Sequence, residues 1–247
     1  MSASRPTAHR ADPAELLPLL TPSADAVLRT AGALTDPQVH APSALPGWTR
    51  AHVLTHLARA ADSRVRLLTA ARTGADLEQY PDEATRDREI EEGARRGAGA
   101  IRSDLDASLR RVLGAIADHP GDKWDVEVSW LGGGLRPARG VLWSLLRELE
   151  VHHVDLAAGH TPAQWPDAFV ARETRRTLGR LLHDPAMPPL RLRVEGDPAV
   201  HSFGDGRGPL VSGPAAEVLA WLAGRTDGSA LTVEPPGDLP PLPDWKR

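Results

Sequence analysis

The stretch Leu145-Leu-Arg-Glu-Leu-Glu-Val-His-His-Val-Asp-Leu156 repeats apolar residues every three or four positions, which is the spacing of an amphipathic helix. On a helical wheel that turns about 100° per residue, Glu148 and His152 lie about 40° apart and within the arc of the apolar residues. Glu150 and His153 fall about 200° and 140° from Glu148, so we expect this second pair to face away from the core. The helix therefore carries one carboxylate and one imidazole on its buried face.

A second helix offers a third polar group of the same kind. Its apolar face is marked by residues at i, i+3, i+4 and i+7: Val53, His56, Leu57 and Ala60. Burying ionisable groups costs several kcal/mol unless they are paired or bind a metal. Two histidines and one carboxylate leave one coordination position open, which is typical of a catalytic metal site. A buried Glu–His ion pair is the alternative interpretation, and His52, one turn earlier, is expected to be exposed or to lie outside the ligand set.

The surrounding sequence predicts a helical bundle. We expect four helices, at residues 13–33, 49–72, 82–119 and 139–158, with the third interrupted near Gly97. Thr49 is placed as an N-cap and Gly74 as a C-terminal residue of the second helix. A loop or short hairpin containing Gly132-Gly-Gly134 separates the last two. Four helices with short connections favour an antiparallel arrangement.

After residue 160 the pattern changes, because proline and glycine become frequent. Two amphipathic helices are expected, at residues 167–183 and 214–224. The alternation in Leu190-Arg-Leu-Arg-Val194 predicts a half-buried strand, with residues 200–203 as its hairpin partner and 230–233 as a further strand. The predicted fold class is α+β, with a helical bundle over residues 1–160 and a small α/β domain over 161–247.

Composition excludes several classes of protein. The chain has 247 residues and a net charge of −4 with no polybasic tail, which argues against nucleic-acid partners. No apolar run approaches the roughly 20 residues of a membrane helix, and the first 15 residues lack a signal sequence, so the expected location is the cytoplasm. The absence of cysteine excludes disulfides, thiolate zinc sites and a catalytic cysteine. The oligomeric state is left open.

Several segments resemble the mycothiol-dependent maleylpyruvate isomerase family, which belongs to the wider DinB-like metal-binding bundles. The matching segments are Leu45-Pro-Gly-Trp-Thr-Arg-Ala-His-Val-Leu-Thr-His56, Tyr80-Pro81, Arg86-Asp-Arg-Glu-Ile90, Arg147-Glu-Leu-Glu-Val-His-His-Val-Asp-Leu156, Val211-Ser-Gly-Pro-Ala-Ala216, Trp221-Leu-Ala-Gly-Arg225 and Leu239-Pro-Pro-Leu-Pro-Asp-Trp245. The resemblance covers most of the chain and is weakest over residues 1–44 and 98–119.

The resemblance implies a four-helix bundle followed by a small domain similar to sterol-carrier folds. It also implies a divalent metal, usually zinc, held by His56, Glu148 and His152. Arg225 would bind the substrate carboxylate and stabilise the enolate, and Arg86 is a second candidate for anion binding. The ordinary alternatives are a solvated cation near a helix C-terminus for Arg225 and a surface charge run for Arg86.

The chemistry implied by the resemblance uses the sulfur of a small-molecule thiol such as mycothiol or ergothioneine. A metal lowers the pKa of the thiol, and the thiolate adds to the cis double bond of maleylpyruvate. Rotation and elimination then give fumarylpyruvate. The same site could serve a thiol S-transferase that conjugates mycothiol, ergothioneine or bacillithiol to electrophiles. A further alternative is a non-catalytic ligand carrier.

Overall fold

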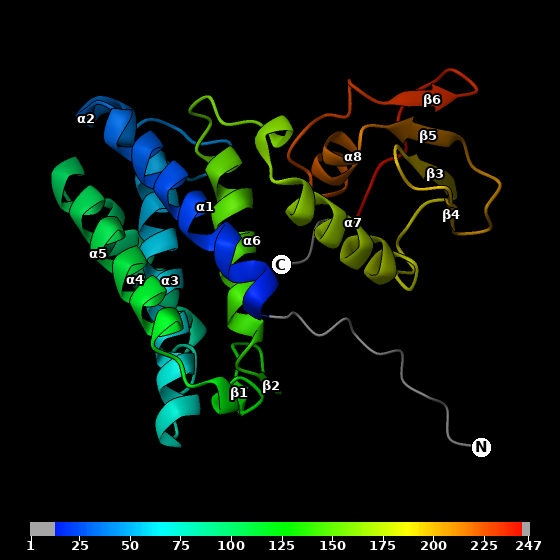
Figure 1. The fold of residues 1–247 in the computed structure, drawn as a ribbon. Coiled ribbons are helices and arrows are strands. Elements are labelled where there is room, and N and C mark those ends of the chain that lie inside the picture. Colours follow the sequence, from blue (N-terminus) through cyan, green and yellow to red (C-terminus); the bar gives the residue numbers. More distant parts are fainter. Residues whose placement is uncertain (1–12, 244–247) are drawn as a thin grey trace, which may run out of the picture. The chain divides into compact units, whose positions relative to one another are not determined.

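The computed structural model describes residues 13–243 and divides the chain into two compact units between Ala158 and Gly159. This division lies two residues before the predicted boundary. Figure 1 shows a helical N-terminal unit and a C-terminal unit of helices and a small sheet. The predicted α+β fold class is confirmed. The last residues of the Leu239–Trp245 motif lie outside the described part of the chain.

The N-terminal unit is built around four long helices. They are α1 (Pro13–Ala33), α3 (Arg50–Thr73), α5 (Ala98–Ala117) and α6 (Gly140–Asp155). Helix α3 packs against α5 and α6, and α1 packs against the same two, so the four helices close a ring around one core. The shorter α4 (Glu83–Ala94) packs on α3. Helix α2 (Asp36–Val39) lies in the connection between α1 and α3. A hairpin of β1 (Glu127–Ser129) and β2 (Leu135–Pro137) precedes α6.

Local sequence signals set the helix ends. Helix α3 begins after Thr49 in an extended conformation and ends at Gly74, whose φ of 73° is the left-handed conformation that glycine adopts without strain. Helix α4 starts at Asp82, whose side chain accepts a hydrogen bond from the Thr85 amide. The third predicted helix is interrupted before α5 at Gly97, as expected.

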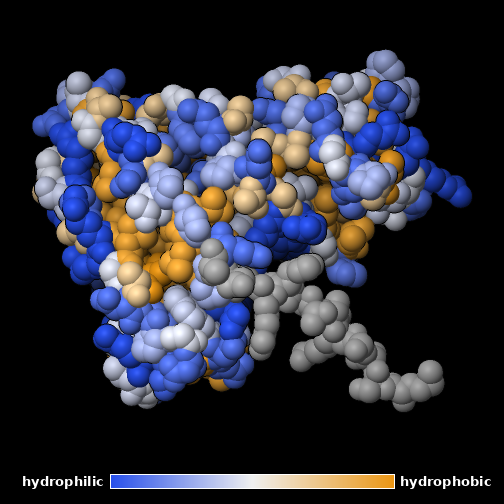
Figure 2. Space-filling view, viewed as in Figure 1, coloured by the Kyte–Doolittle hydropathy of each residue, from blue (hydrophilic) through white to orange (hydrophobic). Residues whose placement is uncertain are grey.

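Helix α6 is buried on more than one side, because α1 and α3 both pack against it. Its apolar residues include Leu142, Leu145, Leu146 and Leu149, each no more than 1% exposed. Figure 2 shows hydrophilic residues over most of the outer surface of the bundle, with apolar residues gathered where α1 and α5 face each other. The helices therefore turn their apolar faces inward, and α6 packs against both α1 and α3.

The C-terminal unit places two helices on a mixed sheet. The elements are η2 (Pro162–Gln164), α7 (Asp167–Leu181), β3 (Leu190–Val194), β4 (Val200–Phe203), β5 (Leu210–Gly213), α8 (Ala215–Leu222) and β6 (Thr232–Glu234). The strand order is β4-β3-β5-β6, with β3 and β5 parallel and the other pairs antiparallel. Leu190, Leu192 and Val194 alternate with exposed arginines and join side chains of α7 and α8 in one apolar core.

Some short elements were not predicted from the sequence. Strand β5 was not predicted, and the loop before α3 contains the short helix α2. An η1 turn (Gly121–Lys123) also precedes the β1–β2 hairpin. Within residues 13–243, none of the helices combines the length and apolar character needed to cross a membrane.

Candidate metal centre

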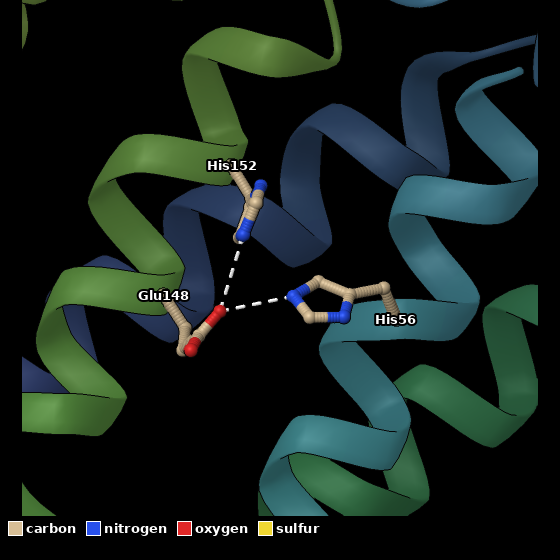
Figure 3. Close-up of side chains that lie close together, drawn as sticks. All are labelled: His56, Glu148 and His152. Carbon is tan, nitrogen blue, oxygen red and sulfur yellow. Dashed lines mark hydrogen bonds and ion pairs between the residues drawn. The ribbon is translucent and has the colours of Figure 1, made fainter. Parts of the chain in front are cut away.

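Three potential metal ligands from two helices converge inside the bundle. His56 comes from α3, and Glu148 and His152 come from α6 (Figure 3). The Glu148 Oε2 atom lies 2.9 Å from His56 Nε2 and 3.1 Å from His152 Nε2. The two imidazole rings meet edge to face with centroids 4.5 Å apart. One nitrogen or oxygen atom from each residue lies within 4.8 Å of the others.

Helix geometry explains this convergence. Glu148 and His152 are four residues apart, so both project from one side of α6 onto α3, where His56 meets them. The side chains of His56 and His152 are 5% and 6% exposed, whereas that of Glu148 is 18% exposed. The structure thus brings together the three residues that the helical periodicity selected, and it leaves the carboxylate partly accessible.

The electrostatics of the three groups differ. Burial and the neighbouring His152 lower the pKa of His56 to about 4, so this imidazole is neutral at pH 7. Burial would lower the pKa of His152, but hydrogen bonds with Asp155 and Glu148 outweigh it and raise that pKa. Burial would likewise raise the pKa of Glu148, yet Arg64 and the two imidazoles hold it well below its usual range.

The donor set fits a divalent cation. Two imidazole nitrogens and one carboxylate oxygen are ligands that zinc accepts, and three protein ligands leave a position for a small molecule. In the protein without metal, Glu148 Oε2 faces His152 Nε2 across 3.1 Å, and this pairing contributes to the raised pKa of His152. A cation in that space would contact all three donors at once.

Two further buried side chains hold the ligands, and the sequence interpretation did not assign either a role. Asp155, 1% exposed, accepts a hydrogen bond of 2.8 Å from His152 Nδ1. Arg64, 3% exposed, donates to Glu148 Oε1 over 2.9 Å. A signal for each was present: Asp155 follows His152 by three residues, and Arg64 interrupts the apolar face of α3 one turn after Ala60. Such outer partners orient ligands and tune their basicity.

Arg86, a predicted anion-binding residue, lies beside this cluster. Its Nη2 atom is 3.5 Å from His56 Nδ1, and its Nη1 atom donates to the carboxylate of Asp87. The side chain of Arg86 is 15% exposed, whereas that of Asp87 is 61% exposed. The guanidinium therefore lies at the solvent-facing edge of the cluster, on the side of His56 away from Glu148.

His52 lies outside the ligand cluster, as the sequence predicted. Its Nδ1 atom is 2.7 Å from the Thr49 hydroxyl and accepts a hydrogen bond from the Thr49 amide, which caps the start of α3. Its Nε2 atom is 3.5 Å from Glu91. Trp48 stacks on the His52 ring and also contacts the His56 ring, with centroids 5.7 Å apart. The histidine thus helps to fix the end of the helix that carries His56.

The expectation that Glu150 and His153 face away from the core is wrong. Both are buried, at 4% and 3% exposure, and α1 supplies polar partners for them on this side of α6. Ser23 donates a short hydrogen bond to Glu150, and the Thr30 hydroxyl lies 2.7 Å from His153 Nε2. Both residues belong to the α1–α6 contact and are separate from the cluster of Figure 3.

Arg225 belongs to the C-terminal unit, where it follows α8. Its amide donates to the Ala220 carbonyl, and its Nη1 atom donates to the Ala223 carbonyl over 2.7 Å. These bonds tie the residue to the end of α8, which is a favourable place for a positive charge. Its role in binding a substrate stays a prediction.

Comparisons with known proteins cover both units. A family model described as the mycothiol maleylpyruvate isomerase N-terminal domain matches residues 20–157, and the C-terminal domain model of the same family matches residues 154–244. No match is found among curated proteins. A crystal structure of a mycothiol-dependent maleylpyruvate isomerase is 27% identical, with a TM-score of 0.89 over 96% of this chain and 98% of that one.

A histidine-to-alanine mutant of that isomerase gives the same TM-score at 26% identity and the same coverage. The two family models together span nearly all the described residues, and each solved structure matches over 96% of this chain. The chain belongs to the mycothiol maleylpyruvate isomerase family.

Proposed function

We propose that the chain is a cis–trans isomerase that depends on a divalent metal and a small-molecule thiol, and that it converts maleylpyruvate to fumarylpyruvate. The observation that carries this proposal is the buried cluster of His56, Glu148 and His152 in a member of this family. The similar solved protein is described as a mycothiol-dependent maleylpyruvate isomerase, which supports mycothiol as the thiol and maleylpyruvate as the substrate.

Each residue of the cluster would have a distinct task toward the metal, which we propose to be zinc. His56 offers a neutral nitrogen, Glu148 offers one carboxylate oxygen, and His152 offers Nε2 while Asp155 holds its other nitrogen. A divalent ion held there would lower the pKa of a thiol and so supply a thiolate at neutral pH. The chain contains no cysteine, so the nucleophilic sulfur must come from a cofactor.

Arg86 supports the binding of an acidic substrate at this site. When His56 uses Nε2 as a ligand, its Nδ1 carries a hydrogen and becomes a donor. Nδ1 and the Arg86 Nη2 atom are then two donors 3.5 Å apart, and a carboxylate oxygen can accept from both. We assign a second carboxylate contact to Arg225, which would stabilise the enolate formed on addition.

The proposed reaction conserves the thiol. The thiolate adds to one carbon of the cis double bond, and the electron pair of that bond moves to the adjacent carbonyl oxygen as an enolate. The carbon–carbon bond, now single, rotates. The enolate then re-forms the double bond in the trans geometry and expels the same thiolate. The protein's contribution is to orient the carboxylates, to exclude water and to stabilise the enolate.

The test is an incubation of metal-loaded protein with maleylpyruvate and, separately, mycothiol, ergothioneine, bacillithiol and glutathione, followed by mass spectrometry. The proposal predicts fumarylpyruvate in large excess over the thiol supplied, with a thiol other than glutathione. Loss of thiol one for one, with a stable thioether, would instead identify a thiol S-transferase. No reaction with any thiol would contradict both, and protein that purifies without stoichiometric metal would favour a ligand carrier.

A further inference from the structure

A buried arginine lies against the proposed metal-binding carboxylate and has no assigned part in the proposed reaction. Arg64 follows His56 by two turns of α3 and is 3% exposed. Its Nη1 atom donates to the Ala60 carbonyl and to the Ser63 hydroxyl, each over 3.0 Å. Its Nη2 atom donates to the Ser144 hydroxyl over 2.7 Å and to Glu148 Oε1 over 2.9 Å. Both ends of the guanidinium are therefore fixed by the bundle.

The partners of Arg64 leave Glu148 as its counterion. Ala60, Ser63 and Ser144 contribute neutral oxygens, and Glu148 is the one carboxylate that pairs with Arg64 among residues 13–243. A guanidinium is ionised at every physiological pH, so this positive charge is permanent. An arginine buried in this way is costly unless its charge is matched, and its position is explained by the carboxylate.

The two oxygens of Glu148 have separate partners. Oε2 faces the Nε2 atoms of His56 and His152, whereas Oε1 accepts from Arg64. A carboxylate can bind a cation through both oxygens only if both face it. Because Arg64 occupies Oε1, Glu148 presents Oε2 alone to the space between the histidines. The remaining coordination positions are thereby kept for other ligands.

The charge of Arg64 also affects which ligand is favoured. The negative charge of Glu148 would cancel half the charge of a divalent ion. The positive charge of Arg64 balances that of Glu148, so the centre keeps a net charge close to that of the ion itself. The other arginine near the cluster, Arg86, is paired with Asp87 on the solvent side. Removing the Arg64 charge would therefore lower the net charge of the centre by one, which disfavours any anion that enters it.

We propose that Arg64 is a positioning residue of the metal centre, which restricts Glu148 to one ligand oxygen and supplies the positive charge that favours an anionic ligand over water. The inference rests on the proposed metal site and deepens it, since it names the charge of the small molecule that the centre selects. A thiolate satisfies this requirement, whereas a neutral thiol does not.

The test uses Co²⁺-loaded full-length protein and thiocyanate as the anionic probe, followed by visible absorption. Arg64→Met removes the charge and keeps much of the side-chain length, Arg64→Lys keeps the charge, and Arg59→Met is the matched control. Arg59 lies on the same helix but pairs with Asp62 and Asp104. We expect Arg64→Met to bind Co²⁺ and to bind thiocyanate roughly 10- to 100-fold more weakly, whereas Arg64→Lys and Arg59→Met stay within about twofold of wild type.

Thiocyanate affinity in Arg64→Met equal to that of wild type would overturn the inference, and so would Co²⁺-loaded wild type that binds no thiocyanate. Wild type that takes up no stoichiometric Co²⁺ would overturn the metal centre itself, which separates the two failures. If Arg64→Met does not fold, Arg64→Lys is used instead. A large loss of thiocyanate affinity in Arg64→Lys, which keeps the positive charge, would contradict the claim that this charge favours the anion. The absorption of Co²⁺ in Arg64→Lys should also change, because a lysine donates to Oε1 without the fixed fork.

Discussion

Replacing Asp155 by asparagine should weaken metal binding while leaving every proposed ligand in place. The Asp155 carboxylate is 1% exposed and accepts from His152 Nδ1 over 2.8 Å, so it holds the ring with Nε2 toward Glu148. An amide keeps the shape but loses the negative charge, and His152 becomes a weaker base. Changes to such outer partners typically cost about 10- to 100-fold in metal affinity, or about 1.4 to 2.7 kcal/mol.

The assay is competition for Zn²⁺ against a chelator of known affinity, measured at about pH 8. Asp155 also raises the pKa of His152, so in the variant a proton competes less well with Zn²⁺ for this imidazole, which partly offsets the loss of metal affinity. At about pH 8 this competition between proton and metal is small. Glu150→Gln is the matched control, because it makes the same chemical change on the same helix at a buried carboxylate that contacts Ser23 instead. Equal Zn²⁺ affinity in Asp155→Asn and Glu150→Gln would refute the reasoning.

Three further outcomes are expected. His56→Ala should lose bound metal and activity together, whereas His153→Ala should keep its metal by elemental analysis. Loss of metal in His153→Ala, with metal retained in His56→Ala, would show that the ligands have been assigned to the wrong side of α6. Arg225→Ala should keep its metal but turn over more slowly in steady-state assays, and Arg225→Lys should also be impaired because the planar fork is lost; unchanged turnover would argue against a role in catalysis. Metal binding at about pH 6 should release up to one proton. The raised pKa of His152 leaves that imidazole protonated, whereas His56, with a pKa of about 4, is already neutral, so metal affinity should rise with pH. Calorimetry in buffers of different ionisation enthalpy that detects no released proton would contradict this.

The sequence contained enough information to select one face of α6, but it did not show how many neighbours that helix has. Glu148 and His152 share an arc with the leucines of the helix, and they meet His56 as periodicity indicated. Glu150 and His153 were expected to face away from the core because the helical wheel of α6 shows one apolar arc, and one arc predicts one buried side. In the bundle a second helix, α1, supplies Ser23 and Thr30 as polar partners, so this side of α6 is also buried.

The second unit shows a different limit. The alternating residues of β3 are covered on one face, and such a strand can be identified from its period of two. Strand β5 lies between β3 and β6, and its four residues lie between Pro209 and Pro214. So short a segment carries no periodicity. Long-range pairing with β3 and β6, which a local pattern does not encode, makes it a strand.

Arg64 and Asp155 illustrate why the outer part of the site was missed. An arginine within an apolar stripe is unusual, but its partner, Glu148, is on another helix and 84 residues away. Asp155 lies three residues from His152 and could have been proposed from spacing alone. Partners on the same helix follow from periodicity, whereas partners across the bundle depend on how the helices pack.

The most direct test of the account is calorimetric titration of Zn²⁺ into metal-free protein, with catalytic turnover of maleylpyruvate and a trace of mycothiol measured on the same samples. The account predicts saturation at about one ion per chain, with turnover that rises in proportion to occupancy and is absent in Glu148→Ala. Turnover that is complete without metal, or that is unaffected by Glu148→Ala, would contradict it.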